Sequence, residues 1–267
     1  MNASNRVNGL ALALVASAVA MPVRAQSLAQ RVRAVGTGVA ELHYVARPGT
    51  CGDGRDSFSF GNAMHVGAWY GGAADGMMTP CQPGPARVRL RVEGGTVTSL
   101  RVSVGPARRS EERPTELGAV SSREAVAFLL GLADSTDGNV ARRAIDAAVL
   151  ADSVSVWPQL LAIASDSVHA SRSARKTATF WAGQFAAAKL AGHADDLGAM
   201  DDGDDRDDSR SAAVFALSQL RGHAGVEPLL QVARTNRDPY VRRKAIFWLG
   251  ESGDPRAIAL FREILRG

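Results

Sequence analysis

The residues with the clearest chemical character are the carboxylates between positions 195 and 208. This stretch holds Asp195, Asp196, Asp201, Asp202, Asp204, Asp205, Asp207 and Asp208. Clustered carboxylates could chelate Ca²⁺, but an EF-hand loop needs a glycine at its sixth position and a glutamate at its twelfth. No frame that begins at Asp201 or Asp202 supplies both. Because like charges at this density repel one another, we interpret the run as a solvated loop and predict no metal site.

Residues 1–25 have the pattern of a secretory signal. Arg6 provides a basic start, Leu10 to Val23 is an apolar run, and Val23-Arg24-Ala25 resembles a cleavage site. The alternative is a membrane anchor, but the apolar run is shorter than the roughly 20 residues that a spanning helix needs. We therefore expect cleavage near Ala25, no membrane span in the mature chain, and a periplasmic or secreted protein.

The chain has two cysteines, Cys51 and Cys81. A pair of cysteines in an exported chain is typical of a disulfide. Zinc binding is the alternative, but neither cysteine has a partner at Cys-x-x-Cys spacing, and His43 and His65 lie at no recognisable ligand interval. We predict one disulfide, which by closing a glycine-rich loop stabilises the fold by about 3–4 kcal/mol.

Motifs that would indicate catalysis are missing from the sequence. There is no Gly-x-Ser-x-Gly elbow, no His-Glu-x-x-His pair and no phosphate-binding glycine loop. We predict no catalytic residues and no cofactor. The alternative is a small enzymatic or ligand-binding site in the N-terminal region, suggested by the loop residues Asp53, Asp56, His65 and Asp75, which have no diagnostic spacing.

Composition indicates a folded protein with no preference for nucleic acid. The chain has 267 residues, of which 46% are hydrophobic and 22% charged, with a formal net charge of +4. No basic block with interleaved aromatic residues occurs, so we expect no nucleic-acid binding.

A change in pattern along the chain predicts two domains. Residues 26–105 are rich in glycine, and Ala86 to Val104 alternates apolar residues with polar ones around Gly94-Gly95, which predicts a β-hairpin. Further strands are expected at 39–45 and 63–70. The arginines of the hairpin (Arg87, Arg89, Arg91 and Arg101) form either a solvated face or a surface for an acidic partner or lipid headgroup, and we favour the solvated face.

The region after the hairpin changes from loop to helix. Residues 106–118 are charged and contain proline, which is typical of a linker. From 119 to 267 apolar residues recur at helical spacing, and Ser121 to Glu124 forms a capping box. The predicted fold class is α+β, with a small antiparallel β domain followed by an α-helical solenoid.

The helical region contains an internal repeat. Ala245 to Glu251 (AIFWLGE) resembles Ala178 to Gln184 (ATFWAGQ) and, more faintly, Ala213 to Gln219 (AVFALSQ). Repetition at this period is the signature of an α-solenoid, in which each unit buries its apolar face against its neighbours. The Phe-Trp pairs could form an aromatic pocket, but their repetition favours a role in the core.

The last unit is specific enough to suggest a family. Asp238-Pro239 with Val241-Arg242, then Phe247 to Gly250, then Gly253 to Ile258 resembles the HEAT repeat, in the short form often found in bacterial proteins. The resemblance covers about residues 119–267. It implies a curved right-handed stack of helix pairs used as a binding scaffold, with Asp238 and Arg242 pairing between neighbouring repeats.

The sequence therefore predicts an exported, non-enzymatic scaffold with a protein partner that it does not identify. In HEAT-like stacks the second helix of each pair is expected to form the inner surface. On that basis the partner-binding residues are expected to be Gln231, Arg234, Arg262 and Arg266.

Overall fold

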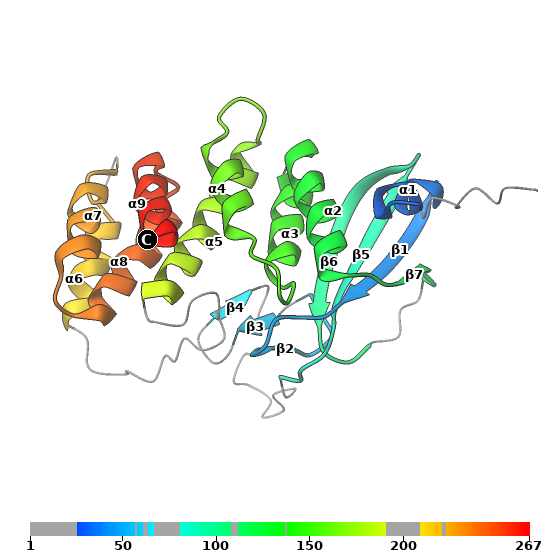
Figure 1. Cartoon of the computed structure of the whole chain (residues 1–267), viewed down its shortest axis with the longest axis horizontal. Coiled ribbons are helices and arrows are strands. Elements are labelled where there is room, and N and C mark those ends of the chain that lie inside the picture. The colour runs from blue at the N-terminus through cyan, green and yellow to red at the C-terminus, as the bar shows by residue number, and fades with distance from the viewer. Residues whose placement is uncertain are drawn as a thin grey trace, which may run out of the picture.

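The computed structural model describes residues 26–56, 58–60, 64–66, 81–107, 112–136, 138–190, 209–220 and 223–267. In these ranges an N-terminal mixed sheet is followed by a row of helices (Figure 1). None of the helices in these ranges is long and apolar enough to cross a membrane. The predicted signal at 1–25, Asp75 and the aspartates of 195–208 lie outside the described residues.

The main sheet confirms the predicted hairpin. Its strand order is β6 (Thr96–Val104), β5 (Ala86–Glu93), β1 (Gly38–Tyr44) and β7 (Thr115–Ala119). Gly94 and Gly95 make the turn between β5 and β6 with φ angles of 56° and 77°, a region that glycine enters without steric cost. The apolar residues of β5 alternate inward, as the pattern predicted.

Strand β7 corrects the predicted linker. Residues 115–118, assigned to a linker from their composition, pair parallel to β1. The edge of β1 offers unpaired backbone groups, and β7 together with the Val120 N–H, which donates to the His43 carbonyl oxygen at 2.9 Å, satisfies part of it. This segment forms a strand because it pairs with β1, which is distant in the sequence, and not because of its local composition.

The sheet and the helices share one continuous hydrophobic core. Helix α3 (Gly138–Val149) packs on β6 and on α2 (Ser122–Ser135), and α2 also contacts α1 (Leu28–Ala34). Helix α1 begins at a capping box in which Ser27 and Gln30 satisfy each other's backbone N–H groups. Packing, and not only a connecting segment, therefore joins the two parts of the chain.

A second, small sheet carries the predicted disulfide. It consists of β2 (Thr50–Gly52), β3 (Phe58–Phe60) and β4 (Met64–Val66) in antiparallel order. Cys51 and Cys81 form a disulfide, which fits an oxidising compartment. Phe60 is buried with its ring centroid 5.6 Å from that of Trp181, so this sheet packs against the helices.

The remaining helices form pairs, as the repeat predicted. They are α4 (Trp157–Ser165), α5 (Arg172–Leu190), α6 (Ser209–Ser218), α7 (Val226–Thr235), α8 (Pro239–Ser252) and α9 (Pro255–Arg266). Asp238 and Asp254 cap α8 and α9, and a proline follows each in the first helical turn. Arg242, which the resemblance placed in a contact between repeats, instead donates to the Asn236 carbonyl oxygen of its own turn at 2.8 Å.

The helix pairs are not stacked in chain order. The pair α8–α9 lies between α4–α5 and α6–α7, so the last pair of the chain sits inside the row (Figure 1). Helices α5 and α8 meet at Gly183 and Gly250, where a Cβ added to Gly183 would lie 3.4 Å from the Gly250 Cα. The Phe180 and Phe247 rings, 6.2 Å apart, complete the contact. The two strong copies of the repeat thus pack against each other.

Candidate functional site

Two units of three helices, α3–α4–α5 and α6–α7–α8, correspond to each other. The α3–α4 turn (150–156) and the α6–α7 turn (219–225) span the same number of residues. Their backbones differ in the described residues, because Ser153 has a φ of 57° in the first turn, whereas in the second it is His223, the counterpart of Val154, that has a φ of 63°. Helices α4 and α7 both begin without a side-chain cap and bury a Leu-Leu pair at the same place. The two units therefore share the order and spacing of their helices, with turns that differ in backbone conformation.

The tryptophans of the two units have different surroundings. Trp181 of α5 is fully buried and donates its indole N–H to Asp146 Oδ1 of α3 at 2.9 Å. Burial raises the pKa of the Asp146 carboxyl, against the hydrogen bond from Trp181. Trp248 of α8 is only partly buried and packs on Phe215, the counterpart of Asp146, with ring centroids 5.2 Å apart. The predicted core role is confirmed for Trp181 and holds only in part for Trp248.

Trp248 lines an open pocket of about 410 Å³ where α6, α7 and α8 meet. The apolar wall consists of Leu217, Leu220, Val226, Leu229 and Trp248, and the polar groups belong to Ser218, Gln219, His223, Glu251 and Ser252. Two large apolar side chains of this end of the solenoid are exposed, Phe215 to 47% and Leu220 to 48%. Such a combination is typical of a binding site for a partner.

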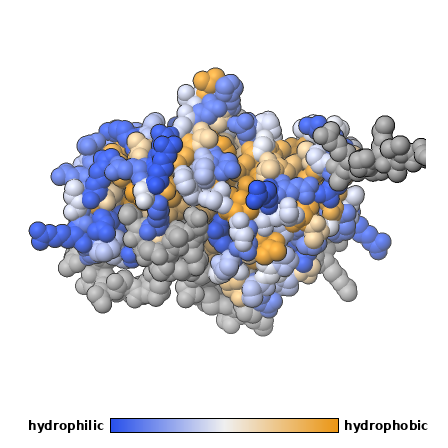
Figure 2. Space-filling model, in the orientation of Figure 1, coloured by the Kyte–Doolittle hydropathy of each residue, from blue (hydrophilic) through white to orange (hydrophobic). Residues whose placement is uncertain are grey.

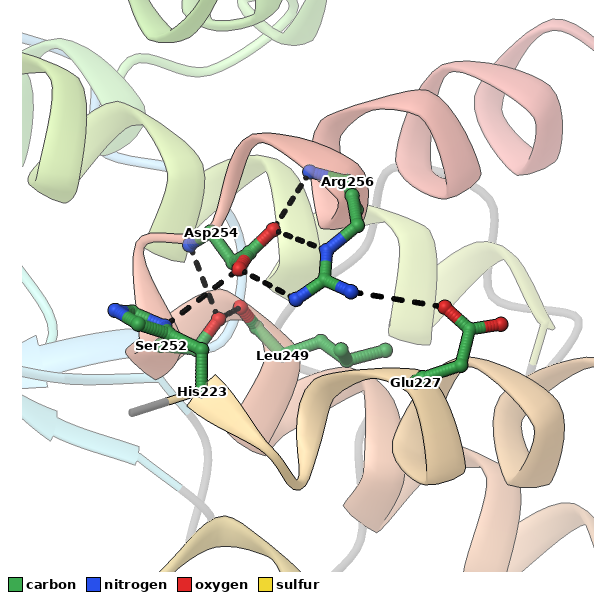
Figure 3. Close-up of polar contacts among 6 residues, drawn as sticks. All are labelled: His223, Glu227, Leu249, Ser252, Asp254 and Arg256. Atoms are coloured by element: carbon green, nitrogen blue, oxygen red, sulfur yellow. Dashed lines mark hydrogen bonds and ion pairs between the residues drawn. The ribbon is translucent and has the colours of Figure 1, made fainter. Parts of the chain in front are cut away.

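A polar network beside the pocket holds the α8–α9 turn (Figure 3). Asp254 is buried, accepts from the Arg256 N–H at 2.9 Å, and binds the Arg256 guanidinium through both oxygens at 3.0 Å. This guanidinium lowers the pKa of the Asp254 carboxyl. Arg256 also lies 3.8 Å from Glu227 of α7, so the network connects the two helix pairs. The sequence interpretation missed this cluster, although Asp254 before Pro255 has the form of a helix cap.

His223, Ser252 and Asp254 are the residue types of an acyl-transfer triad, but their geometry indicates a structural role. The Ser252 hydroxyl donates to the Leu249 carbonyl oxygen at 2.7 Å, and His223 Nδ1 lies 3.5 Å from Asp254 Oδ2. Since Arg256 holds both oxygens of Asp254, the carboxylate is engaged with the guanidinium rather than dedicated to the imidazole.

The predicted contact residues lie in one layer of helices. Gln231 and Arg234 project from α7, and Arg262 and Arg266 from its neighbour α9. Arg234 lies 3.6 Å from Glu263, and Arg262 donates to Ser165 Oγ of α4 at 3.0 Å. The surface over α7 and α9 is largely hydrophilic (Figure 2). All four residues lie on these two helices, which the Arg234–Glu263 contact connects.

Asp53 and Asp56, two of the loop residues that suggested a small enzymatic or ligand-binding site in the N-terminal region, have separate partners. Asp53 accepts from the Arg55 N–H at 2.9 Å, and Asp56 lies 3.7 Å from Arg101. His65 is placed only by its backbone, opposite Ser59 in the small sheet. Within the described residues no group of three or more His, Cys, Asp or Glu side chains could hold a metal ion.

The arginine face of the hairpin is largely neutralised by the chain itself. Glu41 of β1 is buried between Arg87, at 3.8 Å, and Arg89, with which it forms a close ion pair. Arg91 pairs with Glu112 at 2.7 Å. These contacts reduce the charge that an acidic partner or a lipid headgroup would meet.

Paired helices in two layers, connected by short turns, define the helical region as an α-solenoid. The family model of HEAT repeats matches residues 194–267, the range that contains α6 to α9. The C-terminal region is therefore a HEAT-like domain, as the sequence resemblance predicted. No curated protein and no solved structure matches the chain.

Proposed function

We propose that the protein is an exported, non-enzymatic scaffold that binds another protein through its C-terminal helical repeats. HEAT repeats are generally protein-interaction scaffolds, and the match covers the helices that carry the pocket. The signal-like segment 1–25 and the disulfide support export to a periplasmic or extracellular compartment.

The observation that carries this proposal is the incomplete cover of α6. Its counterpart α3 is buried from Ala144 to Val149, because α2, α5 and β6 pack around it. Among the described residues, α6 packs chiefly on α7 and α8, and Phe215 of α6 and Leu220 of the following turn are exposed. Terminal repeats of a solenoid require a polar outer face for solubility, so exposed apolar side chains here favour a partner that covers them.

The partner surface proposed here extends from this end of α6 over the polar layer of α7 and α9. Gln231, Arg234, Arg262 and Arg266 would then make the polar contacts around an apolar centre, which is the common arrangement at protein interfaces. The carboxylates Glu227 and Glu263 lie among these arginines, so the surface has both signs of charge.

Site-specific photocrosslinking in the cells that make the protein tests the proposal. A photoreactive residue at Gln231 or Leu220 is expected to capture one and the same protein. The same residue at the exposed Thr98 of β6 serves as the control and is expected to capture none. Capture from Thr98 alone, or from no position, would contradict the assignment of the surface. Mass determination of the mature chain, expected to begin at Gln26, tests export separately.

A further inference from the structure

The first of the two corresponding units contains a socket that is filled by a side chain from the sheet region. Arg47, which follows β1, is 6% exposed and reaches the α3–α4 turn. Its guanidinium donates to the carbonyl oxygens of Val149 (3.3 Å) and Val154 (3.1 Å) and lies 5.4 Å from the centroid of the Phe185 ring. Because Val149 is the last residue of α3, the cation sits at the negative end of that helix.

The segment that carries Arg47 is extended and pairs with the same turn. The Arg47 N–H donates to the Leu150 carbonyl oxygen at 2.7 Å, and the Asp152 N–H donates to the Val45 carbonyl oxygen at 3.0 Å. Ala46 and Ala151 form an antiparallel bridge. The socket therefore recognises both an arginine side chain and the backbone of a short extended segment.

The pocket at the α6–α7 turn occupies the position that this socket has in the first unit. When the helices are aligned, the end of α3 and its turn (Val149, Leu150 and Val154) match Ser218, Gln219 and His223. In the third helix of each unit, Gln184 and Phe185 of α5 match Glu251 and Ser252 of α8. All five counterparts line the pocket of about 410 Å³. His223 and Ser252, from the turn and from α8, lie beside each other (Figure 3). The space that the Arg47 side chain fills in the first unit is thus an open pocket in the second.

Two substitutions between the sockets change the chemistry of the open one. Glu251 stands where the first socket has the neutral Gln184, so the pocket carries a carboxylate in addition to the negative end of α6. Ser252 stands where the first socket has Phe185, which makes room in the pocket. The added carboxylate favours entry of a cation from outside the chain, whereas the missing ring removes the cation–π contact that Arg47 has in the first socket.

We propose that this pocket binds an arginine side chain carried on an extended segment of the partner protein, at the position that corresponds to the Arg47 socket of the first unit. The inference rests on the proposed protein-binding function and specifies the chemistry of the partner. Arginine fits better than lysine, because its planar fork can donate to two carbonyl groups at once while it faces the Glu251 carboxylate.

The segment of the chain itself supplies a probe. A peptide with the sequence of residues 42–49 (LHYVARPG) is titrated into the chain with its disulfide intact, and a second peptide has alanine in place of the arginine. Backbone amide chemical shifts report where the peptide binds, and the fluorescence of Trp248, in a variant in which the other tryptophans are phenylalanine, reports how tightly. The first socket is occupied by Arg47, so shifts at the residues around the pocket distinguish the two sites.

Three variants make the test specific. Glu251→Gln installs the residue of the first socket and is expected to weaken binding of the arginine peptide roughly fivefold. Glu93→Gln removes an equal charge from the exposed end of β5, away from the pocket and the partner surface, and is expected to leave binding unchanged. Ser252→Phe restores an aromatic ring beside the guanidinium and is expected to strengthen binding about two- to fivefold.

Saturable binding that depends on both the arginine and Glu251, with shifts around the pocket, supports the inference. Equal binding of the two peptides, shifts elsewhere, or no binding at millimolar peptide would overturn it. These outcomes are independent of the crosslinking experiment. A partner captured at Gln231 together with an inert pocket would leave the scaffold function standing and refute the socket alone.

Discussion

Replacement of Arg47 by alanine tests whether the sheet and the solenoid are joined through a buried cation. The variant leaves the Val149 and Val154 carbonyl groups without this donor, in a region where Arg47 is 6% exposed. Each carbonyl left unsatisfied costs about 1–3 kcal/mol, and each buried methylene lost adds about 0.8 kcal/mol. The guanidinium no longer has to be desolvated, which offsets part of the loss. We expect the free energy of unfolding to fall by about 3–4 kcal/mol.

Urea denaturation followed by tryptophan fluorescence and circular dichroism measures this change. Arg47→Lys keeps the charge but cannot span both carbonyl groups, so an intermediate loss is expected. Arg55→Ala is the matched control, because its side chain is 62% exposed and its ion pair with Asp53 is worth little. If Arg47→Ala lowered the free energy of unfolding no more than Arg55→Ala, Arg47 would not stabilise the contact between the sheet and the solenoid. The comparison of the two sockets would then fail as well.

Four further predictions concern the buried groups and the disulfide. Trp181→Ala is expected to lower the free energy of unfolding by about 3–5 kcal/mol, and Trp248→Ala by clearly less, because Trp248 is partly exposed. Equal losses of unfolding free energy in denaturant titrations would contradict the difference between the units. Burial holds the folded-state pKa of Asp146 above 3.8, so the folded state keeps this proton to a higher pH than the unfolded state does, and stability falls as pH rises above about 4. Asp146→Asn should lack this fall when unfolding free energies are measured from pH 3 to 8. The Asp254 pKa is lowered by the Arg256 guanidinium, so its contribution is fully present above 3.8 and is lost as pH falls through the lower folded-state pKa. Asp254→Asn should be weaker than wild type at pH 7 by about 1 kcal/mol, and this difference should shrink as pH falls below 3.8. Reduction of Cys51–Cys81 is expected to lower the free energy of unfolding by about 3–4 kcal/mol, measured by denaturation with and without reductant.

Local patterns predicted the elements whose cause is local. The Gly94-Gly95 turn and the alternation around it define the hairpin, and Ser121 and Asp238 begin helices where their side chains can accept backbone N–H groups. Strand β7 could not be predicted in this way. Its composition is that of a linker, and only the free edge of β1 makes it a strand.

The candidate site was predicted only in part for a similar reason. The chain contains the layer of Gln231, Arg234, Arg262 and Arg266 as spaced helical residues, and packing of α7 beside α9 brings them together. The pocket has no signature in the sequence, because it depends on a turn, on the end of α6 and on a face of α8. The counterpart filled by Arg47 depends on a residue about 100 positions from the carbonyl groups it binds.

The sequence by itself determined that the C-terminal half is built from repeated helix pairs, since all three copies carry the apolar face and the two strong copies also carry the glycine that close packing needs. Only the tertiary structure decided their order. Gly183 and Gly250 permit α5 and α8 to approach closely, and this contact places the last pair inside the row and leaves α6–α7 at its end. The same repeated unit is therefore closed by Arg47 in one place and open in another, because the segment that fills the first socket belongs to a sheet that packs at only one end of the solenoid.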